Sequence, residues 1–450
     1  MTLTGRKMQF AAAVSRRTDT DEAVQEIIAS LHRQLSGSID LLTLFFTTEH
    51  QENAALMAFQ LRQALNPRVL IGCGAEGIIG GDREIEREPG ISAMAGSMPG
   101  VLLTPFQIDY VEWEYLLNAG LDENDSLTEN VNQINLGRNV FNAECLKSDK
   151  LNDFNTDVFE AESPLYERLG INRDTLMGDQ DATRAFLVLG DPYTTPISEF
   201  LQALDRVGGG APTVGGMASG GQQPGENVLL LNDQTFDDGV VGVHIAGPIR
   251  VDTIVSQGCG PIGETLLVTQ AEEQVINMLS GRPALSVAQD MLNKLLPSEQ
   301  EQVQNGSLFL GIVTNEYQDA FERGDFLVRH VVGADLETGA LVVGDTVRAG
   351  QTVQFHIQDA ASADEDLRLM LLRSTSHDVA PLGGLIFSCN GRGLRMFDTS
   401  NHDVRAVLEA VPETPLAGFF AAGELGPVGG KSHIHGLTAS IVLFRSSLEA

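Results

Sequence analysis

Residues 383–393, GGLIFSCNGRG, decide how the rest of this chain is interpreted. A short apolar run ends there in a glycine-rich turn that carries one arginine. Residues 418–427, GFFAAGELGP, repeat the pattern with one glutamate in place of the arginine. Each run predicts a buried strand followed by a turn, because short apolar segments bounded by glycine are typical of interior strands. Glycine in such turns permits positive φ and a close approach of the backbone to a ligand.

Arg392 and Glu424 are the charged residues of these two turns. We expect both at strand ends, where open α/β sheets bind their ligands. A guanidinium matches a carboxylate and a carboxylate matches an ammonium, so the two predict a site for an amino acid or a similar small carboxylate. The alternative is a structural ion pair between Arg392 and Glu424. The predicted ligand-binding residues are Cys389, Asn390, Gly391, Arg392, Gly393, Glu424, Lys431 and His433.

The composition is that of an acidic globular protein. The 450 residues include 61 acidic and 29 basic side chains, which gives a formal net charge of −32. Nucleic acids and anionic membranes bind basic patches, so we expect neither as a partner. The apolar run at residues 10–14 is too short for a signal peptide, and no stretch is long enough to span a membrane. Four separated cysteines (Cys73, Cys145, Cys259 and Cys389) predict reduced thiols in a cytoplasmic protein.

Elements of the first half repeat in the same order. A strand at 41–46, a helix at about 51–65 opened by a Thr48/Gln51 capping box, and a strand at 69–73 with a glycine turn form a βαβ unit. Asp19 is the predicted N-cap of an earlier helix. A second copy runs from 185 to 245. We expect a looser third copy, with a strand at 352–357, a helix at 364–373, a strand and glycine turn at 385–389, and paired strands at 418–424 and 437–444.

The predicted fold is α/β, with mixed sheets built from repeated βαβ-plus-hairpin units and helices on the outer faces. We divide the chain into two halves, residues 8–250 and 251–446. Residues 109–180 are rich in Asp, Asn and Glu and low in hydrophobicity, which predicts a long acidic insertion in the first half.

Several of these motifs resemble one known family. Residues 387–393 (FSCNGRG) with 423–427 (GELGP), and residues 256–263 (SQGCGPIG) with 281–285 (GRPAL), are similar to FIST (F-box and intracellular signal transduction) proteins. The resemblance covers nearly the whole chain and implies FIST N-terminal and C-terminal domains. It implies a sensory module that binds a small ligand, with amino acids as the suggested ligands. No F-box or kinase motif is evident, so signalling through a separate protein is expected.

Two other functions compete with this interpretation. Some members of the family are linked to haem and nitric oxide sensing, and His433 and His435 lie at a spacing that one metal can bridge on a strand. The remaining alternative is a thiol-dependent enzyme in which Cys389 is the nucleophile and a nearby histidine the base. No GxSxG, HExxH or kinase signature appears. We therefore expect a binding protein without a cofactor, not an enzyme.

Overall fold

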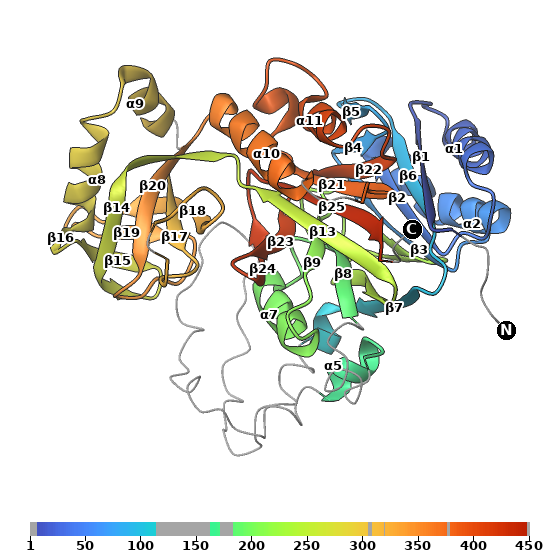
Figure 1. Ribbon diagram of the computed structural model, residues 1–450, viewed down its shortest axis with the longest axis horizontal. Coiled ribbons are helices and arrows are strands. Elements are labelled where there is room, and N and C mark those ends of the chain that lie inside the picture. The colour runs from blue at the N-terminus through green and yellow to red at the C-terminus, as the bar shows by residue number, and fades with distance from the viewer. Residues whose placement is uncertain are drawn as a thin grey trace.

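The computed structural model describes residues 7–113, 163–171, 183–304, 308–318, 320–375 and 379–447. Most of the predicted acidic insertion, including Cys145, lies outside the described residues. Figure 1 shows a smaller lobe at the left, built from β14 to β20 with α8 and α9, beside a larger lobe that contains the other sheets. Mixed sheets with helices on their outer faces confirm the predicted fold class.

The larger lobe contains three sheets of six strands each. The first has the order β1 (Gln9–Ser15), β6 (Ile91–Ser97), β2 (Leu41–Thr47), β3 (Val69–Ala75), β10 (Leu229–Leu231) and β11 (Gln234–Phe236). The second has the order β24 (Lys431–His435), β23 (Glu424–Val428), β9 (Thr213–Met217), β8 (Thr183–Gly190), β12 (Val240–Ala246) and β7 (Leu102–Ile108). The third has the order β13 (Ile249–Ser256), β25 (Ala439–Ser446), β21 (Gly383–Cys389), β22 (Leu416–Ala421), β4 (Gly77–Gly80) and β5 (Arg83–Glu86).

The three sheets have the same plan. Each contains one parallel pair, β2–β3, β8–β9 or β21–β22. The pairs are joined by α2 (Ala54–Leu65), α7 (Ile197–Val207) and α11 (His402–Ala410). Each unit also sends a hairpin to another sheet: β4–β5 pairs with β22, β10–β11 with β3, and β23–β24 with β9. The larger lobe is therefore a threefold repeat with exchanged hairpins.

The third copy exists, but its predicted elements were displaced by one position. The strand at 385–389 was matched to the second strand of a unit, whereas β21 is the first and β22 the second. The strand predicted at 352–357 is β20 of the smaller lobe. The error has a local cause: β21 also ends in a glycine turn, and α11 is short, with its N-cap Asn401 in a left-handed conformation (φ 64°).

A glycine in the second parallel strand recurs in every unit. A Cβ on Gly72, Gly215 or Gly418 would lie 2.1, 1.8 or 1.8 Å from the carbonyl oxygen of the residue paired with it on the neighbouring strand. Those paired residues are Leu44, Val188 and Ile386. No side chain fits at such distances, so these glycines allow the two strands of each parallel pair to approach.

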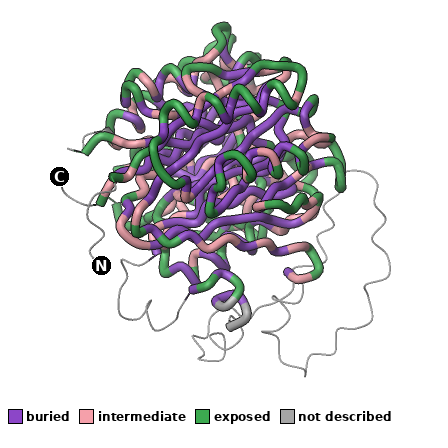
Figure 2. The backbone as a smooth tube through the Cα atoms, turned by 90° about the vertical axis from the view of Figure 1, so that its right-hand side faces the viewer, coloured by how far each residue is buried: buried purple, intermediate pink, exposed green. Residues whose placement is uncertain are grey.

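One central core lies between the three sheets. It includes Phe45 and Ile71 of the first sheet, Leu187 of the second, and Phe387 and Phe419 of the third. Helices cover the outer faces, α1 (Thr20–Gln34) and α2 on the first sheet, α5 (Ser163–Arg168) and α7 on the second, and α10 (Ala360–Thr375) and α11 on the third. In Figure 2 the buried residues accordingly form the centre and the exposed ones the rim.

The two predicted helix starts had different outcomes. Asp19 caps α1 by accepting a hydrogen bond from the Glu22 amide at 2.9 Å, as predicted. The Thr48/Gln51 capping box is wrong, because Thr48–Asn53 forms a 3-10 helix, η1, without a side-chain cap, and α2 starts only at Ala54.

The smaller lobe is a closed barrel inserted into the third unit between β13 and β21. Its strands follow the order β14 (Cys259–Glu272), β20 (Thr352–Gln358), β17 (Leu308–Val313), β18 (Phe326–Ala334), β19 (Leu341–Val343), β15 (Val275–Leu279) and β16 (Arg282–Pro283). The long β14 pairs with both β20 and β15, which closes the sheet on itself. The helices α8 (Ala284–Leu292) and α9 (Pro297–Gln304) belong to this lobe.

Candidate functional site

The predicted site begins where β21 ends. Asn390 donates its backbone N–H to the Ala421 carbonyl (3.0 Å), which ties the turn to the end of β22. The chain then enters a short 3-10 helix, η2 (Gly393–Arg395). Gly393 has φ 56°, and a Cβ there would lie 2.6–2.7 Å from the Glu86 carboxylate. This glycine is therefore required both by its left-handed backbone and by the close approach of β5.

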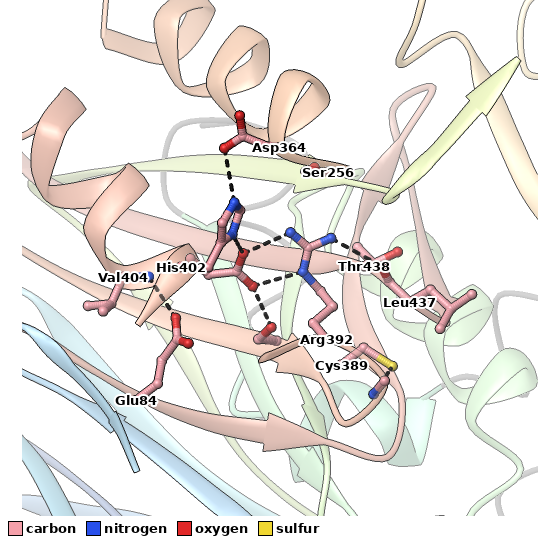
Figure 3. A network of polar contacts seen from close by, with 12 residues as sticks. Glu84, Ser256, Asp364, Cys389, Arg392, His402, Val404, Leu437 and Thr438 are labelled. Carbon is pink, nitrogen blue, oxygen red and sulfur yellow. Dashed lines mark hydrogen bonds and ion pairs between the residues drawn. The ribbon is translucent and has the colours of Figure 1, made fainter. Parts of the chain in front are cut away.

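Arg392 is fully buried, and its guanidinium binds Asp403. The Nε and Nη2 atoms each donate to one Asp403 oxygen at 2.8 Å, and Nη1 faces the Leu437 carbonyl at 3.4 Å (Figure 3). Asp403 also accepts hydrogen bonds from the Ser388 hydroxyl and pairs with the His402 ring. Burial alone would raise the pKa of Asp403, but Arg392 holds that pKa below its usual value. Because this pair is bidentate, it occupies the two guanidinium N–H groups with which Arg392 would bind a ligand carboxylate.

Two of the motifs that resemble the FIST family, residues 256–263 and 387–393, meet at this ion pair. Gly258 has φ 69°, and a Cβ on it would lie 2.9 Å from Arg392 Nη1 and 2.4 Å from the Leu437 carbonyl. The neighbouring Ser256 hydroxyl donates to Asp366 of α10 at 2.8 Å. Segments 256–259 and 389–393 are therefore packed so tightly that only glycine fits at position 258.

Glu424 is also fully buried, but it does not pair with Arg392. Its Oε2 accepts a hydrogen bond from the Thr438 amide (3.1 Å), and its Oε1 has no partner among the described residues. Burial raises the pKa of Glu424 well above its usual value. Burial, and then the nearby Glu424 carboxyl, raise the pKa of the Cys389 thiol to about 12. A thiolate on Cys389 is thus disfavoured at neutral pH, which weakens the thiol-enzyme alternative.

The expected convergence of Arg392 and Glu424 on one hollow needs correction. Both side chains are interior, and neither lines the hollow that lies beside this turn, which is described below. The alternative, a structural ion pair between Arg392 and Glu424, is wrong, because Arg392 forms its ion pair with Asp403. That either residue contacts a ligand stays a prediction, and the geometry gives Arg392 a supporting position behind the turn.

Lys431 and His433 lie on β24, beside β23. The register pairs Gly426 with His433 and Val428 with the exposed Lys431, so both lie further along the hairpin than Glu424. Burial, with the Arg329 charge beside it, lowers the pKa of His433 to about 4. No group of three potential metal ligands occurs among the described residues. The haem alternative gains no support from this histidine pair.

A shallow hollow, partly open to solvent, does lie next to the predicted turn. It is at the carboxyl ends of β3, β21 and β22, where the hairpin β4–β5 joins the third sheet. Its lining residues are Glu76, Gly77, Glu86, Arg87, Asn390, Arg395 and Phe420. Of the predicted ligand-binding residues, Asn390 lines it, and its Oδ1 is buried without a hydrogen-bond partner in the described structure. Such an atom at a cavity wall requires an explanation.

Charges of both signs surround this hollow. Arg395 forms a two-bond ion pair with Glu76 and donates to the Asn390 carbonyl at 2.8 Å. Glu86 accepts a hydrogen bond from the Leu394 amide at 3.0 Å, and burial raises its pKa. Arg87 is exposed and has a left-handed backbone, φ 60°, which is uncommon for a residue with a side chain.

None of the charged lining residues was predicted from the sequence. Most of them lie on or directly beside the hairpin β4–β5, which was not predicted. A signal for it was present: Gly81-Asp82 separates the runs 77–80 and 83–86, and a two-residue Gly-Asp loop is a hairpin signal. That the hairpin crosses to a sheet more than 300 residues away in sequence had no local signal.

Comparisons with known proteins agree with the sequence motifs. The FIST N domain matches residues 40–282 and the FIST C domain residues 284–427. An uncharacterized protein of Mycobacterium tuberculosis is 34% identical over 439 residues, covering 97% of this chain and 100% of the relative. Another, of Mycobacterium bovis, is 32% identical over 444 residues, covering 98% and 100%. No helix in the described part of the chain has the length and apolar character needed to cross a membrane.

Among solved structures, a cyanuric acid hydrolase from A. caulinodans aligns with 97% of this chain and 99% of its own, at 9% identity. Its TM-score of 0.34 is too low to support an argument. Two domain models and full-length relatives above 30% identity are decisive by contrast. The chain belongs to the FIST family, whose domains are associated with the sensing of small ligands in signal transduction.

Proposed function

We propose that this protein senses an amino acid or a similar small carboxylate in the hollow beside Asn390 and signals through a separate protein. The observation that carries the proposal is a hollow that presents two arginines and two glutamates beside Asn390, whose Oδ1 is buried and has no hydrogen-bond partner among the described residues. A buried acceptor without a donor costs free energy that a bound ammonium or amide would recover.

The lining offers a place for each part of such a ligand. The carboxylate fits Arg395 and Arg87, because a guanidinium fork bonds both oxygens. The ammonium fits Glu86 and the Asn390 Oδ1, while the Phe420 ring offers apolar contact. The hollow is shallow and leaves room for about one water molecule, so we expect a small metabolite that enters only as the Arg395–Glu76 pair opens.

The ion pair between Arg395 and Glu76 would be the arrangement of the site when no ligand is bound. The Glu76 carboxylate holds the guanidinium fork in the position where a ligand carboxylate would bind. Both side chains are nearly half exposed, at 45% and 44%, so the pair is weak enough for a ligand to displace. The left-handed Arg87 fits the same interpretation, since strained backbone gathers at binding sites.

Calorimetric titration with the common amino acids and with small carboxylates tests the proposal. We expect at least one of them to bind, and Arg395→Gln to weaken that binding about 10- to 100-fold, the effect of losing a charge-assisted hydrogen bond. The matched control is Arg405→Gln, because Arg405 is exposed on α11 and does not line the hollow. Absence of binding by every compound, or equal binding by the Arg395 variant, would refute the proposal.

A further inference from the structure

The hairpin β4–β5 caps a helix to which it is not connected in sequence. Helix α11 begins after Asn401, whose side chain makes no cap bond to its own helix. Instead the Asn401 Oδ1 accepts the Glu84 amide N–H at 2.7 Å. The Glu84 Oε1 in turn accepts the Val404 N–H at 2.9 Å, the bond that Figure 3 draws between these two residues. The first amides of a helix have no partner within it, so this reciprocal pair of bonds replaces the missing cap.

The same strand reaches the hollow through Glu86. Side chains two residues apart on a strand share a face, so Glu84 and Glu86 point to the same side of β5, while Ile85 between them enters the central core. Glu86 accepts the Leu394 amide of η2 and lines the hollow. One short strand therefore holds the start of α11 with one carboxylate and the wall of the hollow with the next.

The environment of Glu84 is poorly suited to a second negative charge. Its side chain is buried, and its Oε2 has no hydrogen-bond partner among the described residues. The elements packed against β5 are β4, the start of α11 and η2. Their charged or titratable residues, with those of β5 itself, are His402, Asp403 and Arg405 in the first turn of α11, Arg395 on η2, and Arg83 and Glu86 on β5, and β4 has none.

Of these neighbours, the Asp403 carboxylate acts most strongly on Glu84. Burial first, and then Asp403, raise the pKa of Glu84 to about 7, and the bond from the Val404 amide opposes them. Asp403 itself remains ionised because it is paired with Arg392. When Glu84 releases its proton to solvent, two carboxylates face each other at the start of α11.

We propose that Glu84 is a positioning residue of the hollow, and that its ionisation loosens the contact between the hairpin β4–β5 and α11 and weakens ligand binding as the pH rises through neutrality. The part of this inference that concerns ligand rests on the proposed function. The part that concerns the hairpin and the helix does not, because it is measured on the protein alone.

Amide hydrogen exchange along α11, corrected for the intrinsic rate, tests the protein part. From about pH 6 to about pH 8 we expect protection in the unmodified protein to fall roughly tenfold. Each pH unit between the ordinary pKa of an exposed carboxyl and the raised pKa of Glu84 is worth a factor of ten, and the fall ends above about pH 7. Glu84→Gln, which is neutral and of equal size, should show no such change. Glu199→Gln, on the exposed face of α7, is the matched control and should behave like the unmodified protein.

A ¹³C titration of the Glu84 carboxyl group gives an answer even if the variant does not fold. A midpoint near 7 supports the inference, and a midpoint near the ordinary value of about 4.3 overturns it. Protection of α11 that does not change with pH in the unmodified protein overturns it as well.

The ligand part is then measured at the same pH values with the tightest ligand of the screen. We expect the Kd of the unmodified protein to rise with pH and that of Glu84→Gln to remain constant. Equal pH dependence in both would show that Glu84 does not control the hollow. If no compound binds, the proposed function fails, while the exchange result still decides whether Glu84 acts on α11.

Discussion

The ends of β8 and β21 are matching places in two repeat units, and they treat their polar groups differently. Asp191 follows β8 directly and is fully buried. One of its oxygens accepts from the Tyr193 and Thr194 amides and the Thr194 hydroxyl, and the other accepts from Asn227. Three of these four donors belong to the turn itself and the fourth, Asn227, lies 36 residues further on, so both carboxylate oxygens are satisfied. After β21, by contrast, Asn390 is left with an unpartnered Oδ1 at the wall of a hollow.

This difference separates a scaffold position from the proposed site. The same βαβ plan and the same glycine in the second strand produce both places, so the backbone alone does not make a binding site. In the second unit an aspartate satisfies the turn. In the third, the buried Arg392–Asp403 pair holds the turn from behind, and the groups in front face solvent. The stabilising pair and the accessible charges are therefore different residues.

The largest effect should come from breaking the buried pair. Arg392→Met leaves the Asp403 carboxylate buried without its cation, which costs about 3–5 kcal/mol. Asp191→Ala in the second unit removes a buried acceptor and should cost about 1–3 kcal/mol. Urea unfolding measures both.

The double variant Arg392→Met/Asp403→Leu is the control for the first change, because it removes both charges and should recover much of the loss. If Arg392→Met cost no more than Asp191→Ala, the two strand ends would be energetically alike and the contrast between them would be lost.

A smaller effect is the pH dependence of stability that we expect from Glu424, the first residue of β23. Burial raises the pKa of Glu424, so it is neutral in the folded protein at a pH where the unfolded chain has ionised it. Its contribution to stability is complete below about pH 4.3, the unfolded value, and decreases by about 1.4 kcal/mol per pH unit as the pH rises towards the folded pKa. Glu424→Gln cannot ionise, so its stability relative to the unmodified protein should increase with pH. Unfolding curves that stay parallel between about pH 5 and 7 would contradict this assignment.

The sequence was informative where the cause is local. The apolar runs before Asn390 and after Gly418 predicted buried strands, and the glycines of the two turns predicted a crowded backbone. The partners of the charged residues are not local. Asp403 lies in the first turn of a short helix with no distinctive pattern, and Glu86 reaches Leu394 from 308 residues away. Pairing over such separations is set by sheet topology, which neither periodicity nor turn residues encode.

The smallest effect on stability should come from the accessible charges. Arg395 is 45% exposed and its pair with Glu76 is screened by water, so Arg395→Gln should change the free energy of unfolding by less than about 1 kcal/mol. The same change should weaken ligand binding strongly if the hollow is the site. Arg392→Met reverses this order, with a large loss of stability. The two arginines lie three residues apart on one turn, so urea unfolding and calorimetry on the two variants separate the residue that holds the turn from the residue proposed to contact the ligand. Similar stability losses in both variants would show that Arg395, too, belongs to the scaffold.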